Sequence, residues 1–192
     1  MNLDLFIAGF GGQGVLLLGN LLAYAALLEG RNVSYFPAYG VEKRGGAATC
    51  TVVISDGEVG SPVVGRPGCV ILLNQAAVDQ YLARLRPGGW ALVNSSLSDA
   101  APPRLAQGEV LALPLTELAL DVGDARLVNL VAAGIWARKT GAVSLESMES
   151  ALRAVLPERN HRFIPLNVEA MRRGAALVAR ETRIPRDECR DP

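Results

Sequence analysis

The sequence has few cysteines, and none of them has the spacing of a metal or cluster site. Cys50, Cys69 and Cys189 are far apart and form no C-x-x-C pair. This spacing does not match the usual iron–sulfur and zinc motifs, so we assign no metal ligand to the chain. An odd number of widely spaced cysteines also disfavours a disulfide framework, which favours a reducing cytoplasm.

The sequence also has no excess charge and only one histidine. The sequence has 19 Lys and Arg residues against 19 Asp and Glu residues, and its basic residues are scattered. It therefore lacks the basic patch of a nucleic-acid binder, and we expect no nucleic acid among its partners. His161 is the only histidine, and no acid or nucleophile can be assigned as its partner. We therefore assign no catalytic residue.

Long hydrophobic runs are limited to one segment. Residues 15–28 are almost entirely apolar, but they are fewer than the roughly 20 residues that cross a bilayer. Asp4 is the only charged residue before them, so the basic start of a signal peptide is also missing. We expect a buried helix that ends before Gly30, and no membrane span.

Strand-like and helix-like segments alternate along the chain. Short apolar or β-branched runs predict strands at residues 3–8, 32–36, 47–54, 69–73, 90–93 and 110–113. Helical spacing predicts helices at residues 15–28, 75–85, 127–140 and 167–180, with another helix capped by Ser144. Asp56-Gly57 predicts a turn after which residues 58–64 pair back as a hairpin.

This alternation predicts an α/β fold. We expect a Rossmann-like three-layer sandwich with a mainly parallel sheet and an antiparallel hairpin portion. The length of 192 residues suits one domain with a full hydrophobic core, which we place at residues 1–180. Residues 181–192 are charged and contain proline, so we predict a disordered tail there.

A first glycine-rich element lies between the first predicted strand and the first predicted helix. It reads Gly9-Phe10-Gly11-Gly12-Gln13-Gly14 and satisfies G-x-G-x-x-G. Glycines there allow an anionic group to approach the backbone, and the free N–H groups of a helix start attract it. We therefore predict phosphate or pyrophosphate binding, although the glycines could also serve only close packing. No acid ends the second strand, which disfavours NAD.

A second glycine-rich element follows about thirty residues later as Glu42-Lys43-Arg44-Gly45-Gly46-Ala47. Arg44 offers a rigid fork of donors that suits a phosphate or carboxylate. Gly45 and Gly46 allow an exposed, tightly curved loop, so both join the candidate site. The alternative is that Glu42 and Arg44 form ion pairs with another subunit.

Taken together, these segments resemble the gamma subunit of 2-oxoacid:ferredoxin oxidoreductases. The resemblance runs from residue 3 to about residue 180, and it is carried by GFGGQGV, YFPAYGVEKRGGAATCTVVISD, VGSPVV, PGGWALVNSSL and KTGAVSLESMESAL. One departure is Pro67-Gly68, where the family pattern has proline followed by aspartate.

The resemblance implies a role in an enzyme that converts a 2-oxoacid to acyl-coenzyme A and reduces ferredoxin. Thiamine diphosphate and iron–sulfur clusters would lie on alpha and beta partner subunits, with a ferredoxin-like delta subunit as a further candidate. This chain would be a non-catalytic subunit that helps to bind coenzyme A. The alternative is a stand-alone coenzyme A- or nucleotide-binding module.

Overall fold

The computed structural model describes residues 2–39, 46–99 and 108–178. Within these ranges the chain forms a six-stranded sheet in the order β2-β3-β1-β4-β5-β6. The strands are β1 (Asn2–Phe10), β2 (Asn32–Tyr39), β3 (Ala47–Ser55), β4 (Cys69–Leu72), β5 (Gly89–Asn94) and β6 (Gly108–Leu113). The α-helices are α1 (Val15–Leu28), α2 (Gln75–Tyr81), α3 (Leu115–Val122), α4 (Val128–Thr140), α5 (Leu145–Val155) and α6 (Ile164–Ala176).

The sheet has a parallel part and an antiparallel part. β1 pairs in parallel with β4, β4 with β5, and β5 with β6. On the other side of β1, β3 pairs antiparallel with both β1 and β2. The α/β fold with a mainly parallel sheet, predicted from the sequence, is confirmed.

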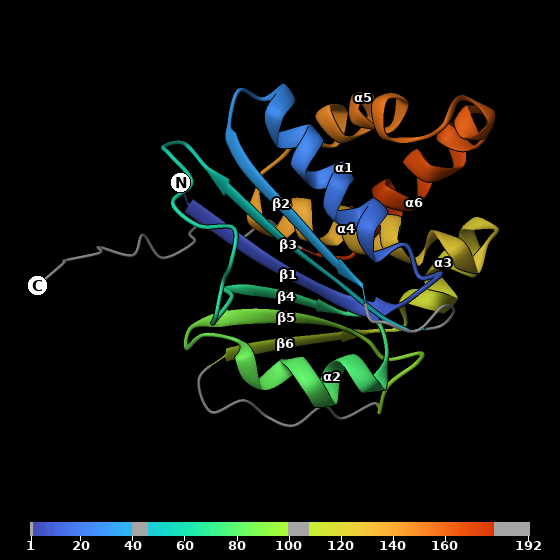
Figure 1. Ribbon diagram of the computed structural model, residues 1–192. Coiled ribbons are helices and arrows are strands. Elements are labelled where there is room, and N and C mark those ends of the chain that lie inside the picture. The colour runs from blue at the N-terminus through green and yellow to red at the C-terminus, as the bar shows by residue number, and fades with distance from the viewer. Residues whose placement is uncertain (1, 40–45, 100–107, 179–192) are drawn as a thin grey trace, which may run out of the picture.

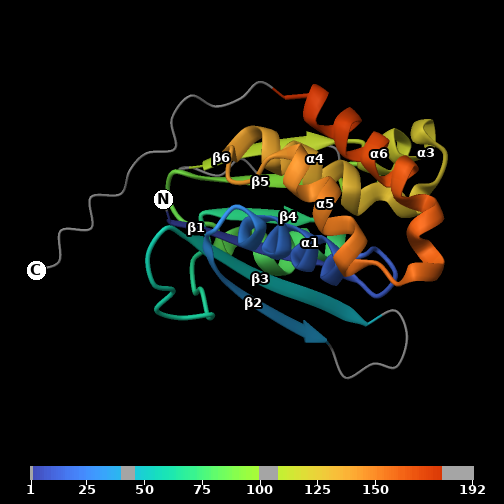
Figure 2. The same ribbon diagram turned by 90° about the horizontal axis from the view of Figure 1, so that it is seen from above.

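Helices cover both faces of this sheet (Figures 1 and 2). The larger hydrophobic cluster joins one sheet face to α1, α3, α4, α5 and α6. The smaller cluster lies on the opposite face, where Ala77 and Val78 of α2 pack on Phe6, Val70 and Ala91. The three layers thus bury apolar side chains on both faces of β1, β4 and β5, which explains why these strands read as continuous apolar runs.

The bounds of α1 are those that the sequence predicts. It begins after Gly14, and Gly30 follows its end with a φ of 76°. Gly19 brings the helix close to β3, because an ideal Cβ there would lie 2.3 Å from the Cys50 sulfur. No helix in the described ranges is long and apolar enough to cross a membrane.

The hairpin predicted after Asp56-Gly57 is wrong. Residues 58–64 lie in the described part of the chain and form no strand. β3 already has β1 on one edge and β2 on the other, so neither edge is left for a returning segment. The antiparallel part of the sheet instead consists of β2 and β3 beside β1.

Several element ends also differ from the prediction. β2 continues through Pro37 to Tyr39, which an edge strand tolerates because one side of its backbone needs no partner. The helix predicted at residues 75–85 ends as α2 at Tyr81 and continues as a short 3₁₀ turn. α6 begins at Ile164, three residues earlier than expected, with Pro165 in its first turn. Residues 181–192 lie outside the described residues.

Candidate functional site

The first glycine element lies at the carboxyl end of β1, between the strand and α1 (Figure 1). From β1 the chain passes through α1 to β2. In the strand order β2 lies on one side of β1, whereas β4 lies on the other side. The turn therefore occupies the topological switch point, where open α/β sheets place their ligands.

Two of the predicted glycines are required by the packing of this turn. Gly14 has a left-handed conformation with a φ of 73°, and an ideal Cβ there would lie 2.4 Å from Nδ2 of Asn129. At Gly9, an ideal Cβ would lie 2.6 Å from Oε1 of Gln13. A side chain would displace Gln13 at the first position, or displace Asn129 and strain the left-handed backbone at the second, so the structural role weighed for these glycines applies to Gly9 and Gly14.

Gln13 ties the turn to the neighbouring strand. Its Oε1 accepts hydrogen bonds from the Phe10 N–H at 2.9 Å and from Nδ2 of Asn74 at 2.8 Å. Its Nε2 donates to the Leu73 carbonyl at 3.0 Å, and the side chain is only 7% exposed. The polar atoms of Gln13 are therefore engaged within the protein, at the crevice between β1 and β4.

The structure places Gly46, at the end of the second glycine element, beside the first element. The Gly11 N–H donates to the Gly46 carbonyl at 3.0 Å, which holds the end of the second loop against the first turn. The Gly11 amide is thus engaged by the protein. Arg44 and Gly45 lie outside the described residues, so their placement stays a prediction.

Donors remain at the start of α1. Among the described residues, no hydrogen-bond acceptor is found for the backbone N–H groups of Gly12 and Gly14. The first turn of α1 contains no acidic residue, and no side chain caps it. Unpaired N–H groups and the positive end of the helix dipole together favour an anion at this position.

Two asparagines at the strand ends have structural partners. Oδ1 of Asn74 accepts from the Ala77 N–H at 2.9 Å and so caps α2. Asn94 accepts from the Leu115 N–H at 3.0 Å, and its Nδ2 donates to the Leu73 carbonyl at 3.2 Å. Both side chains thus bind the carboxyl edge of the sheet together.

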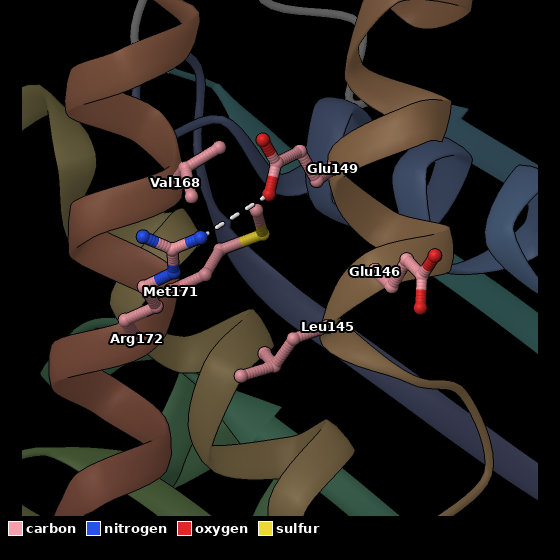
Figure 3. Close-up of a pocket in the computed structure, with 6 residues that line it drawn as sticks. All are labelled: Leu145, Glu146, Glu149, Val168, Met171 and Arg172. Atoms are coloured by element: carbon pink, nitrogen blue, oxygen red, sulfur yellow. Dashed lines mark hydrogen bonds and ion pairs between the residues drawn. The ribbon is translucent and has the colours of Figure 1, made fainter.

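A separate cavity of about 220 Å³ lies in the helical layer between α5 and α6 (Figure 3). An ion pair of 3.4 Å joins Arg172 and Glu149 across it, beside the side chain of Met171. Its lining contains none of the residues that the sequence assigns to the site. In the described ranges, no group of three or more His, Cys, Asp or Glu residues is arranged to hold a metal ion.

The mixed sheet and the glycine turn at its switch point define a Rossmann-like α/β domain. A model of one family, described as "Pyruvate ferredoxin/flavodoxin oxidoreductase", matches residues 4–177. The chain belongs to this family.

Relatives with the same domain differ in length. The 2-oxoglutarate synthase subunit KorC of Methanocaldococcus jannaschii is 34% identical over 160 residues, which cover 82% of this chain and 86% of the relative. The ketoisovalerate oxidoreductase subunit VorA of Methanothermobacter marburgensis is 36% identical over 170 residues, or 88% of this chain but 35% of the relative. The chain thus spans about a third of the length of VorA.

Among solved structures with the same fold, the domain makes up nearly the whole of one chain and about a third of another. The gamma subunit of a keto/oxoacid ferredoxin oxidoreductase from Geobacter sulfurreducens is 35% identical, with a TM-score of 0.76 over 91% of this chain and 96% of that one. A 2-oxoglutarate:ferredoxin oxidoreductase from Magnetococcus marinus, solved with 2-oxoglutarate, coenzyme A and succinyl-CoA, shares the fold at 21% identity. Its TM-score is 0.83 over 94% of this chain and 32% of that one.

Proposed function

We propose that this chain is the non-catalytic gamma subunit of a 2-oxoacid:ferredoxin oxidoreductase. The observation that carries the proposal is the match to the Geobacter sulfurreducens gamma subunit over nearly the full length of both chains. The reaction decarboxylates a 2-oxoacid, transfers the acyl group to coenzyme A and reduces ferredoxin. Thiamine diphosphate and iron–sulfur clusters belong to the alpha and beta subunits and to a ferredoxin-like delta subunit where one is present.

Within this complex, the chain contributes to the binding of coenzyme A. The backbone N–H groups of Gly12 and Gly14 suit a phosphate group, and Arg44 would add a charged fork from the second loop. The contact between Gly11 and Gly46 supports a joint site, because it holds the end of that loop beside the turn. Coenzyme A supplies the thiol that accepts the acyl group, and this chain holds its phosphates.

The chain also packs against the other subunits. Tyr24, Leu27 and Leu28 of α1 are 38%, 53% and 51% exposed, although α1 is apolar almost throughout. Exposed apolar side chains that lie together on a helix mark a surface that a partner covers. The longer VorA relative carries the matched domain as about a third of one polypeptide, which supports a permanent neighbour.

We also place the complex in the cytoplasm. Cys50 and Cys69 are free and buried, and unpaired thiols are typical of a reducing compartment.

The coenzyme A role is tested by an Arg44→Ala variant of the purified complex, with Lys43→Ala as the matched control. Loss of a charge-assisted hydrogen bond is expected to raise the KM for coenzyme A on the order of tenfold while kcat stays unchanged. Steady-state kinetics with varied coenzyme A measure both constants. An unchanged KM together with faster dissociation of the complex would show instead that Arg44 pairs with another subunit.

A further inference from the structure

Asn129 lies against the start of α1, although 115 residues separate it from Gly14. It belongs to the first turn of α4, so the N-termini of two helices meet at this point. From an ideal Cβ at Gly14, the distances are 3.3 Å to the Asn129 Cβ, 2.7 Å to its Cγ and 2.4 Å to its Nδ2. The distances shorten from Cβ to Nδ2, so the amide group of Asn129 reaches the glycine turn with Nδ2 foremost.

Among the described residues, only one of the two polar atoms of the Asn129 side chain has a hydrogen-bond partner. Nδ2 donates to the Gly14 carbonyl at 3.3 Å. Oδ1 is buried and finds no hydrogen-bond donor among the residues that the structure describes, and the whole side chain is 2% exposed. An unpaired buried acceptor destabilises a folded protein, and such atoms are rare in native structures. The weak bond through Nδ2 does not by itself account for an asparagine at this position.

The polar groups at this point define the chemistry of a ligand that would satisfy them all. The N–H groups of Gly12 and Gly14 require an acceptor, which a phosphate supplies. Oδ1 of Asn129 requires a donor, which a hydroxyl or an amide N–H beside that phosphate supplies. A simple inorganic anion such as sulfate satisfies the first requirement and leaves the second unmet.

We propose that Asn129 is a specificity residue that selects a phosphate ester with a neighbouring hydroxyl or amide N–H over simple anions. This inference rests on the proposed binding of coenzyme A, whose phosphates adjoin groups of both kinds. Oδ1 is buried, so this contact requires the turn to shift when the ligand binds. Open space adjoins the turn at Gly12, which has a φ of 108° and no atom within 4 Å of its ideal Cβ position.

The test compares the binding of coenzyme A and of sulfate to the full chain by titration calorimetry. Asn129→Leu keeps the approximate volume and removes both polar atoms. We expect this variant to bind coenzyme A about tenfold more weakly, which corresponds to one hydrogen bond, and to bind sulfate as the unmodified chain does. Asn129→Ala serves as a second variant if the leucine disturbs the fold. Asn167→Ala, at a buried asparagine of α6, is the control.

The melting temperature separates this role from a purely structural one. The leucine variant should melt no lower than the unmodified chain, because it no longer buries an unpaired acceptor. Unchanged coenzyme A affinity in both variants would overturn the inference and leave the coenzyme A site standing. Equal losses for coenzyme A and sulfate would also overturn it, because Asn129 would then only hold the turn. If the unmodified chain binds neither ligand, the proposed coenzyme A site fails together with it.

Discussion

Gln13 closes the crevice in which Rossmann-like domains usually hold a ligand. Its amide bonds to the Phe10 N–H, to Asn74 and to the Leu73 carbonyl, and so bridges β1 and β4. A phosphate at the switch point would therefore lie outside Gln13, at the N–H groups of Gly12 and Gly14. The motif predicts the turn and the helix start correctly, because both depend on neighbouring residues. It does not predict the bonds of Gln13 to Leu73 and Asn74, which are about 60 residues away.

The buried cysteines allow a prediction on thiol reactivity. Burial raises the pKa of Cys50 and of Cys69 to about 12. Because the thiolate is the reactive form, both thiols stay protonated and inert at pH 8. In a Cys189→Ser variant, we expect no reaction with a disulfide reagent while the protein is folded, and reaction of both remaining thiols in denaturant. Rapid labelling of the folded variant would show that one of them is accessible.

The crossing of α4 and α6 depends on two glycines. An ideal Cβ at Gly134 would lie 1.9 Å from the Met171 carbonyl oxygen, and one at Gly174 would lie 2.1 Å from that of Val131. The two backbones therefore touch directly, and a methyl group at either position would push the helices apart.

We predict that Gly174→Ala lowers the free energy of unfolding by about 1–3 kcal/mol, the usual effect of overpacking. Urea denaturation followed by circular dichroism measures the change. Gly60→Ala is the matched control, because a Cβ there meets no atom within 4 Å, and we expect it to be neutral or slightly stabilising. Equal stability of the Gly174→Ala variant would mean that the helices separate without loss.

Local sequence signals predict elements better than they predict pairing. The extent of α1 follows from an apolar run between Gly14 and Gly30, and the structure agrees. The Asp56-Gly57 turn signal is equally strong, yet residues 58–64 after it form no strand. A segment can pair only with a strand that has a free edge, and both edges of β3 are paired, one with β2 and the other with β1. That information lies in contacts between distant residues, so a local pattern does not contain it.

For the molecule as a whole, the family could be predicted from combined motifs, whereas the strand order could not. The placement of β3 between β1 and β2 sets an antiparallel strand where a Rossmann domain has a parallel one. Likewise, nothing local in the sequence indicates that Asn129 meets Gly14. The exposed side chains of Tyr24, Leu27 and Leu28 become visible only once the packing of α1 is known.

The central claim is that the chain works as a subunit of a 2-oxoacid:ferredoxin oxidoreductase. The most direct measurement is anaerobic purification of the tagged chain from its own host, followed by a coenzyme A-dependent assay of viologen reduction with 2-oxoacids. A Leu27→Lys, Leu28→Lys variant is the control, and it should recover fewer partner chains. We predict that thiamine- and cluster-binding chains copurify and that one 2-oxoacid reduces the dye. A chain that purifies from its host without thiamine- or cluster-binding partners, and an eluate that reduces no dye with any 2-oxoacid, would contradict this account.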